Sequence, residues 1–515
     1  MRSTRETLLV EKRMQTRWHR GLLALVVLSS GGCTVGPNYR TPVVETPTAY
    51  KEAENWKPAQ PNDQNLGGNW WTIFQDPQLN ALELQVNISN QNLKAAEAQY
   101  QGARAALRYE RADYYPTVTA GPSASRTRVS GNAPPPGSKF DGVTYNDFVL
   151  PFDFSYQVDV WGRVRRTVES SRDQAQASAA DLATVNLSMH ADLAIDYFQA
   201  RSLDAEEQLL TSTVKQYEDA LELTENRFQG GLSSEVEVQQ AKTQLDTTRA
   251  QAIDVGVLRA QYEHAVAILI GKPPAEFSLP PLPLTAPPPV VPISLPSELL
   301  ERRPDIAAAE RRVAAANAQI GVAKSAYYPV IGLGASGGFD SSSITSLFTG
   351  PSGLWSFGVS ALGTIFDGGR RRALTDQARA GYDFQVASYR ETVLTGFEQV
   401  EDNLAAVRIL ENEAKVQDEA VLAAQRSLDL SNTRYSGGVT SYLEVTIAQS
   451  AALQDEVTAV NILGRRMANT VLLIQALGGG WDRSNLPAQP ECCGKLVSDA
   501  ALSTVTTGPS RQGLP

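Results

Sequence analysis

"RFQGGLSSEVEV", Arg227 to Val238, returns later in the chain as "RYSGGVTSYLEV", Arg434 to Val445. Each copy places an aromatic residue, two glycines and a carboxylate in the same order. A glycine pair of this kind adopts the positive φ of a tight turn between two helices. The repeated stretch therefore predicts two helical hairpins of one design within a single chain.

Other motifs are repeated in the same order. "DYYPTVTAGPSAS" from residue 113 resembles "AYYPVIGLGASGG" from residue 326, and "VWGRVRR" from residue 160 resembles "FDGGRRR" from residue 366. Such self-similarity indicates two halves of one plan. A Pro-rich stretch separates the halves and is typical of an extended connector. We expect an N-terminal segment (33–76), a first repeat (77–270), a connector (271–296), a second repeat (297–480) and an irregular tail (481–515).

Each half also contains a helix of unusual length. An Ala-rich helical stretch (79–114 or 297–327) ends before a proline. We then expect long helices at 165–228 and 371–435, about 100 Å each at 1.5 Å per residue, with return helices at 234–270 and 441–477. Spacings of three and four predict one narrow apolar seam on each long helix. The seam positions are Leu203, Leu210, Val214, Tyr217, Leu221, Thr224 and Phe228, and then Leu410, Ala414, Gln417, Val421, Ala424, Leu428, Ser431 and Tyr435.

Between these helices lie segments with strand periodicity. "FVLPFDFSYQVDV" (148–160) and "LWSFGVSALGTIF" (354–366) alternate apolar with small or polar residues. A soluble sandwich explains such alternation, and so does a tilted strand that crosses an outer membrane with its apolar face toward lipid. Two hairpins supply four strands, too few to close a barrel in which no edge is unpaired, so copies of the chain must associate.

The N-terminus has the pattern of a secretion signal. Arg17, His19 and Arg20 precede the apolar run "GLLALVVLSS" and the small residues of "GGCTV". The pattern predicts a lipoprotein signal at 1–32, with Cys33 carrying diacylglycerol and an N-acyl chain. Ordinary cleavage that leaves Cys33 as a plain thiol is the alternative. The run is too short to span a bilayer, and no other segment predicts a transmembrane helix.

Charge and motif content argue against several classes of protein. Residues 1–32 hold six of the 46 Lys and Arg and two of the 56 Asp and Glu, which leaves 40 basic and 54 acidic residues. That acidic balance argues against binding of nucleic acid. The three His are scattered, and the adjacent Cys492 and Cys493 are too few ligands for a metal site, so we expect no metal site and no cofactor. A nucleophile elbow, a phosphate loop and HExxH are all missing from the sequence, so we expect no enzyme.

Four motifs resemble one family in order. They are "GCTVGPNYRTP", "LLERRPDIAAAERRVAAANAQIGVAKSAYYP", the turns "GGL" and "GGV", and "LGGGW". Together they resemble the outer-membrane efflux lipoproteins of the TolC family, OprM/NodT-like branch. The resemblance implies an α+β fold, in which a homotrimer forms a 12-stranded transmembrane β-barrel continuous with a long periplasmic α-helical barrel.

The resemblance also implies a role and partners. It implies a lipid-anchored exit duct in the outer membrane of a Gram-negative bacterium that passively conducts drugs or other toxic small molecules. A periplasmic adaptor protein and an inner-membrane transporter of the resistance-nodulation-division type would deliver the cargo. Three alternatives remain: an outlet for heavy-metal export, an outlet for type I protein secretion, and a periplasmic coiled-coil lipoprotein that is no channel.

Residue by residue, the resemblance places the adaptor contact at the glycine turns. The matching residues are Gly231 with Leu232 and Gly438 with Val439. A turn without side chains lets another helix tip approach its backbone closely. The alternative is that these glycines only turn the chain.

The resemblance places a periplasmic aperture just beyond the turns. Glu237, Glu444, Leu443 and Tyr435 match its acidic, apolar and aromatic positions. Three chains would bring six carboxylates toward one constriction, which favours cations. Alternatively, both glutamates are solvated helix residues and Tyr435 only continues the seam. The sequence departs from the family pattern at Thr440, Ile447 and Ser450, so it does not imply the salt-bridge latch of some relatives.

Overall fold

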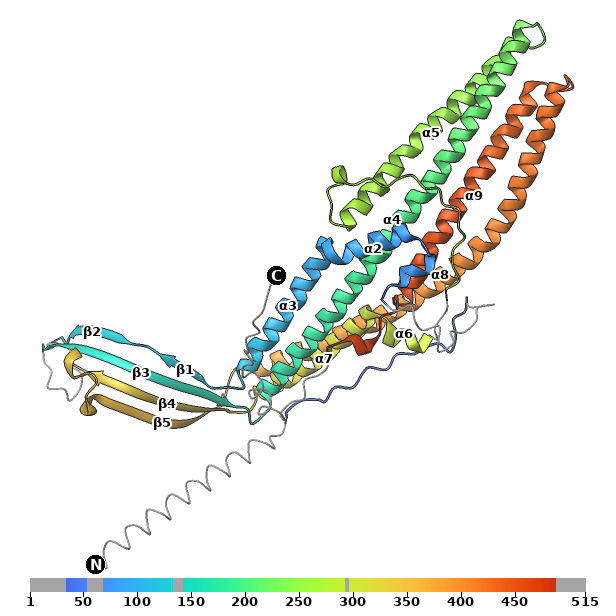
Figure 1. Cartoon of the computed structure of the whole chain (residues 1–515). Helices are drawn as coiled ribbons and strands as arrows, with labels where there is room; N and C mark the ends of the chain where they lie inside the picture. Colours follow the sequence, from blue (N-terminus) through green and yellow to red (C-terminus); the bar gives the residue numbers. More distant parts are fainter. Residues whose placement is uncertain (1–33, 53–67, 131, 133–141, 292–295, 488–515) are drawn as a thin grey trace, which may run out of the picture.

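The computed structural model describes residues 34–52, 68–130, 132, 142–291 and 296–487. Figure 1 shows an elongated molecule with a sheet at one end and a shaft of long helices at the other. The first repeat contains α2 (Pro77–Ser89), α3 (Gln91–Ala112), β1 (Thr117–Ala120), β2 (Ser123–Arg128), β3 (Thr144–Val158), α4 (Arg163–Gln229) and α5 (Glu235–Leu269). The second contains α6 (Pro296–Arg302), α7 (Pro304–Ser325), β4 (Val330–Ser341), β5 (Gly353–Leu362), α8 (Arg370–Ser436) and α9 (Tyr442–Ala476). Short 3-10 helices are η1 (Trp70–Phe74), η2 (Pro274–Glu276), η3 (Ile344–Ser346), η4 (Gly350–Ser352) and η5 (Arg483–Asn485).

The sheet has four strand positions, because β1 and β2 form one interrupted strand. Thr117 lies opposite Ser155 and Ser123 lies opposite Val149, so both pieces keep the same register on β3. The interruption includes Pro122, which has no N–H to donate to a ladder. β3 pairs with β4 and β4 with β5, all antiparallel. The two predicted hairpins therefore become one sheet.

The two faces of this sheet differ in chemistry. Residues that lie opposite each other on antiparallel strands point to the same face. On that basis the apolar face consists of Val118, Ala120, Phe148, Leu150, Phe152, Phe154, Tyr156, Val158, Leu333, Ala335, Phe339, Trp355, Phe357 and Val359. The polar face consists of Thr117, Thr119, Ser125, Asp147, Asp153, Ser155, Ser336, Asp340, Ser356 and Ser360. Trp355 is 85% exposed, so a single chain leaves part of the apolar face uncovered.

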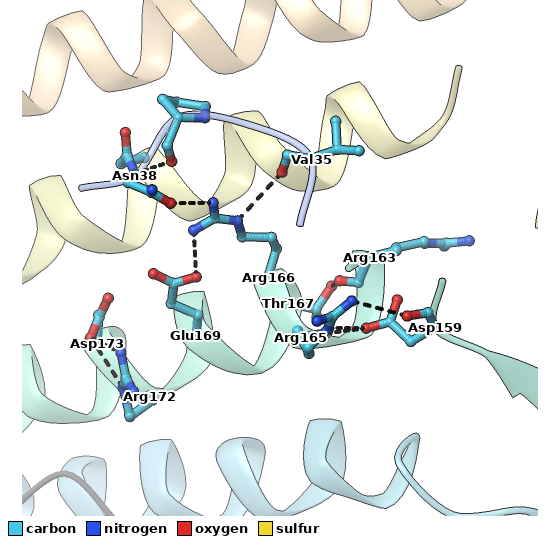
Figure 2. Close-up of polar contacts among 12 residues, drawn as sticks. Val35, Asn38, Asp159, Arg163, Arg165, Arg166, Thr167, Glu169, Arg172 and Asp173 are labelled. Carbon is cyan, nitrogen blue, oxygen red and sulfur yellow. Dashed lines mark hydrogen bonds and ion pairs between the residues drawn. The ribbon is translucent and has the colours of Figure 1, made fainter. Parts of the chain in front are cut away.

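An aspartate stabilises the start of each long helix. Asp159 accepts hydrogen bonds from the backbone N–H of Val164 (3.1 Å) and Arg165 (2.9 Å) at the N-terminus of α4. Asp367 accepts from the N–H of Gly369 (3.0 Å) and Arg371 (3.2 Å) at the N-terminus of α8. Figure 2 shows Asp159 beside Arg165, with their contact dashed. These bonds satisfy N–H groups that have no partner within the helix. This role explains why an aspartate occurs at the strand-to-helix corner of both repeats.

The long helices agree with the sequence prediction within two residues. α4 and α8 contain 67 residues each, and α5 and α9 contain 35 each. Figure 1 shows the α4–α5 and α8–α9 hairpins extending in the same direction away from the sheet. The two hairpins are equal in length, and their turns therefore lie at the same end of the molecule.

Three predicted boundaries are wrong. The helical stretch 79–114 breaks at Asn90, whose side chain caps α3 by accepting from Leu93 N–H at 2.9 Å and donates to the carbonyl of Leu269 at 2.8 Å. The stretch 297–327 breaks at Arg303, because the residue before a proline disfavours helical backbone. The strand expected to reach residue 366 ends at Leu362.

The predicted seam is wrong at one position. Phe228, its last residue on α4, is 45% exposed, whereas Tyr435 at the equivalent place on α8 is 4% exposed. Leu210, Tyr217 and other seam residues nearer the sheet are buried as expected. The two helix tips are therefore not equivalent in their packing.

Residues 34–52, here called the strap, begin beside the sheet. Figure 2 shows how Arg166 of α4 holds this start. Its guanidinium donates to the carbonyl of Val35 (3.4 Å), to Oδ1 of Asn38 (3.1 Å) and to Glu169 (2.8 Å). Val35 N–H donates to the carbonyl of Trp161 at 3.1 Å, at the corner between β3 and α4.

The strap then contacts the second repeat. A Cβ on Gly36, which has φ of 108°, would lie 2.5 Å from Cα of Gly321 on α7, so only glycine fits there. Tyr39 donates to Glu310 on α7. Farther on, the N–H groups of Lys51 (2.8 Å) and Glu52 (3.0 Å) donate to Glu401 on α8, and Glu52 forms an ion pair with Arg408. One short segment thus connects α4, α7 and α8.

The main core lies where helices of both repeats meet, near the middle of the molecule. It buries Trp70, Trp71, Leu79, Val86, Leu193, Tyr197, Phe198, Val266, Ile306, Val393, Val400, Val471 and Ile474. It also buries one titratable pair: Nδ1 of His190 lies 2.5 Å from Oε2 of Glu83, with Trp71 stacked on the imidazole at 4.4 Å. Burial raises the pKa of Glu83 to about 9 and lowers the pKa of His190 to about 4.

The segment after α5 runs extended along the helices, as its proline content predicts. Arg201 donates to the carbonyl of Pro280 at 2.6 Å, and Asp204 accepts from the N–H of Leu282 at 2.8 Å. Arg201 and Asp204 are themselves a buried ion pair at 2.9 Å. Leu279 is 1% exposed, so this connector contributes to the core.

Candidate functional site: the paired turns of the helical shaft

The two hairpin turns have the same backbone. In the first, Gly231 has φ of 72°, and Leu232 N–H donates to the carbonyl of Arg227 at 2.8 Å. In the second, Gly438 has φ of 71°, and Val439 makes the equivalent bond at 2.9 Å. This pattern is the Schellman motif, in which a residue with positive φ ends a helix. The second glycine of each pair therefore has the positive φ that the sequence predicted, whereas Gly230 and Gly437 have φ of -77° and -75°.

Both turns are open. No atom lies within 4 Å of the place where a Cβ would stand on Gly231 or Gly438. Leu232 is 76% exposed and Val439 is 71% exposed, so each tip presents one apolar side chain to its surroundings. Figure 1 places both turns at the end of the shaft farthest from the sheet.

Tyr435 is at the centre of a small core behind the turns. Its ring packs edge-on against Tyr442 at 5.2 Å, and Ala241 and Val445 complete the cluster. Burial raises the pKa of Tyr442 to about 12, so that hydroxyl keeps its proton. The cluster joins α5, α8 and α9.

Residues of the first hairpin bind Tyr435 on the second. The guanidinium of Arg227 lies 4.7 Å from the Tyr435 ring centre and donates to the Tyr435 carbonyl at 3.2 Å. The Tyr435 hydroxyl is 3.5 Å from Oε2 of Glu237, which also accepts from the hydroxyl of Ser233. The first predicted carboxylate therefore takes part in a bond between the hairpins.

The second predicted carboxylate has a different partner. Glu444 forms an ion pair with Arg434 at 3.3 Å, within its own hairpin, and both side chains are about half exposed. Leu443 is 49% exposed and Ile447 is 62% exposed. Ser450 donates to the side chain of Gln244 at 3.3 Å. Glu237 and Glu444 match in the sequence repeat but differ in their surroundings.

Sequence reasoning missed Arg227, Ser233 and Tyr442 as members of this site. A signal for Arg227 was present, because an arginine precedes both turns in the repeated motif. Its contact could not be derived from the motif, since Arg434 occupies the same place and binds a residue of its own hairpin. Cys33 lies outside the described residues.

Two features are absent from the described residues. No helix within 34–52, 68–130, 132, 142–291 and 296–487 is long and apolar enough to cross a membrane. Across the same part of the chain, no group of three or more His, Cys, Asp or Glu side chains is arranged to hold a metal ion.

A family model described as outer membrane efflux protein matches residues 84–272 and 295–479. The match covers both repeats and both turns. The chain belongs to the outer membrane efflux protein family. The two matched stretches follow the internal repeat, with α4 and α5 in one and α8 and α9 in the other.

Individual members of the outer membrane efflux protein family are similar over nearly their whole length. The toluene efflux pump outer membrane protein TtgC of Pseudomonas putida is 32% identical over 462 residues, covering 89% of this chain and 95% of that protein. The cation efflux system protein CusC of Escherichia coli is 30% identical over 467 residues, covering 89% and 98%. The solved structure of the outer-membrane channel OprN superposes with a TM-score of 0.82 at 30% identity, covering 87% of this chain and all of that one.

Membership in the outer membrane efflux protein family defines the assembly. The chain has the TolC-like fold and is the exit duct of an efflux pump in the outer membrane of a Gram-negative bacterium, extending into the periplasm. It works as a homotrimer with a periplasmic adaptor and an inner-membrane transporter of the resistance-nodulation-division type. The sheet is therefore the membrane end of the molecule, and the paired turns are the periplasmic end.

Proposed function

We propose that the chain passively conducts toxic small molecules, that its paired turns bind the adaptor, and that its own side chains perform no reaction. The observation that supports this most directly is the pair of equal hairpins ending together, each with an open glycine turn and an exposed apolar residue. Three chains would present six such tips in a ring.

We assign the adaptor contact to Gly231 with Leu232 and to Gly438 with Val439. A helical tip of a partner can approach a glycine backbone closely because no side chain intervenes. Leu232 and Val439 would then bury apolar surface that is exposed in the single chain. The same glycines also end their helices, so both roles fall on one residue.

We assign the aperture to the residues just behind the tips. Tyr435 is held by Arg227 and Glu237, which fixes the first hairpin against the second. Leu443 and Glu444 are half exposed on α9. In a trimer Leu443 and Glu444 would line the narrow end of the duct, with Tyr435 buried behind them, and separation of the hairpins would widen it.

We also propose that Cys33 carries a lipid anchor. The first described residues after it are bound at the corner between β3 and α4, where Val35 contacts Trp161 and Arg166. Trp161 also stacks on Tyr328 at 4.7 Å, and paired aromatic rings of this kind are typical of a membrane interface. An acyl chain on Cys33 would thus enter the membrane at the depth where the sheet begins.

The names of two relatives point to different substrates. TtgC, at 32% identity, is named as a toluene efflux pump protein, and CusC, at 30% identity, is named as a cation efflux system protein, so the substrate of this chain is a question for experiment. We propose small organic toxicants as the first candidate and metal ions as the second. Deletion of the gene, followed by growth on a panel of solvents, drugs, dyes and metal salts, tests both. Hypersensitivity to organic compounds supports the first, hypersensitivity to metals alone supports the second, and unchanged growth on the whole panel contradicts an efflux role.

A further inference from the structure

The outer end of the sheet carries two exposed arginines. Arg126 and Arg128 on β2 lie opposite Asn146 and Thr144 on β3, in the row that continues from Phe148. Residues opposite each other share a face, so both arginines belong to the apolar side of the sheet. Figure 1 places this end of β2 farthest from the helices, which reach into the periplasm, so it is the end that faces the outside of the cell.

Charges are separated across this end of the sheet. The strand carboxylates Asp147, Asp153 and Asp340 all lie on the polar face. Within the described residues, the apolar side of the five strands carries no carboxylate, and the side chains of Arg126 and Arg128 have no hydrogen-bond or ion-pair partner. Two guanidinium groups are thus directed to the lipid side without a counter-charge from the same chain.

The depth of the arginines follows from strand geometry. The apolar row from Phe148 to Val158 covers about 34 Å at 3.4 Å per residue, which a 40° tilt reduces to about 26 Å. That matches the apolar band of about 25 Å of an outer-membrane strand. Arg126 lies two residues beyond Phe148, which places it about 5 Å above the band, and Arg128 lies about 5 Å higher. This is the level of lipid head groups.

The neighbouring subunit supplies no obvious counter-charge either. The free edges of the sheet are β1 with β2 on one side and β5 on the other, so a closed ring brings β2 next to a copy of β5. β5 contains no charged residue, and neither does the connection from residue 342 to 352. The anion for Arg126 and Arg128 must therefore come from outside the described protein surface.

We propose that Arg126 and Arg128 bind the phosphate groups of the glycolipid in the outer leaflet of the outer membrane. That leaflet consists largely of lipid A, which carries phosphates on a disaccharide head group. An arginine fork matches the geometry of a phosphate and binds it through two parallel N–H donors. The two forks are about 7 Å apart along the strand, and three subunits would offer three such pairs.

The experiment uses the full-length trimer in detergent and measures binding of bisphosphoryl lipid A and of the same lipid with both phosphates removed. At about 1 kcal/mol for each arginine near a lipid surface, we expect about 30-fold tighter binding of the phosphorylated lipid. R126Q/R128Q should bind both lipids equally. R126K/R128K should keep part of the preference because it keeps the charge.

R104Q/R108Q is the matched control, since it removes two exposed arginines from the periplasmic helix α3, and it should bind as the native trimer does. Each variant is first shown to form trimers with native single-channel conductance. A phosphate preference that survives in R126Q/R128Q would overturn the proposal, and so would equal binding of both lipids by the native protein. Inorganic phosphate alone is a third ligand, and binding of it as tightly as bisphosphoryl lipid A would overturn the proposal, because the arginines would then form a site for free anions.

Discussion

The guanidinium of Arg227 lies 4.7 Å from the centre of the Tyr435 ring, although the two residues belong to different repeats. The same arginine donates to the Tyr435 carbonyl at 3.2 Å. A cation held over an aromatic ring contributes about 0.5 to 2 kcal/mol. This contact therefore fastens one hairpin tip to the other within each subunit.

We predict that Arg227→Ala loosens the closed tip. Loss of the ring contact and the hydrogen bond removes about 1 to 3 kcal/mol from the contact between the hairpins. Single-channel recordings in planar bilayers should show higher conductance or longer openings. Arg434→Ala is the control, because Arg434 pairs with Glu444 of its own hairpin; an equal effect of both variants would contradict a special role of Arg227.

We predict that Glu237→Gln combined with Glu444→Gln reduces the preference of the channel for cations. Six carboxylates near one constriction attract cations, and the amides keep the size of the side chains without the charge. The measurement is the reversal potential in a salt gradient. Glu411→Gln combined with Glu413→Gln, farther from the tip on α8, is the charge-matched control, and unchanged selectivity in the Glu237/Glu444 double variant would place the filter elsewhere.

We predict that Gly231→Leu or Gly438→Leu impairs export. A leucine at positive φ costs about 1 to 2 kcal/mol, and its side chain would block the approach of a partner helix. The readout is the minimal inhibitory concentration of an exported compound, together with cross-linking to the adaptor. Gly256→Leu on α5, where a Cβ also meets open space, is the control for bulk alone. Normal export and cross-linking in both turn variants would exclude docking at these glycines.

We predict that the Glu83–His190 pair makes stability fall at alkaline pH. The pKa of Glu83 rises from 4.5 to about 9 on folding, so the contribution of its proton to the free energy of unfolding is lost as pH rises through that range. The pKa of His190 falls from 6.5 to about 4, so its contribution is lost as pH falls through that range. Between pH 4.5 and 6.5 the contributions of Glu83 and His190 to the slope of the unfolding free energy against pH cancel.

Above pH 6.5 only the glutamate contributes, and the loss approaches 1.4 kcal/mol per pH unit at most. Urea midpoints measured from pH 6 to pH 8.5 test this. Glu83→Gln keeps a hydrogen-bond donor for Nδ1 of His190 and removes the titration, so its midpoint should vary less over that range. A midpoint that falls equally in the variant would assign the alkaline loss to other groups.

We predict that Cys33→Ala abolishes incorporation of labelled fatty acid. The prediction follows from the signal pattern and from the position of the strap beside the membrane end of α4. Metabolic labelling followed by purification of the chain provides the measurement. An unlabelled native protein would mean that Cys33 is a plain thiol.

Local sequence features predicted the long helices and the turns well. Pro116 and Pro329 mark the ends of α3 and α7, and the glycine pairs mark the ends of α4 and α8, because each of these signals acts within one turn of chain. The unequal burial of Phe228 and Tyr435 did not follow, because it depends on Arg227 crossing to the other hairpin. Contacts between residues two hundred positions apart leave no local pattern.

The break at Arg303 shows a different limit. Pro304 was visible in the sequence, but the Ala-rich residues after it form a continuous helical pattern. The restriction that Pro304 places on the backbone of Arg303 breaks the helix there, and the Arg303 side chain stabilises the break by bonding the carbonyl of Ala476 (3.0 Å) and Gln399 (2.9 Å) in the core. The Ala-rich pattern hid a break that the proline alone signals.

The strap has a consequence for the order in which the chain matures. Its residues are made early, yet the groups that bind Lys51 and Glu52 lie 350 and 356 positions later in the chain. At about 5 to 20 residues per second, those partners appear roughly 20 to 70 s afterwards. The first described segment of the protein can therefore take its place only after α8 has been made, and it is among the last parts of the chain to do so.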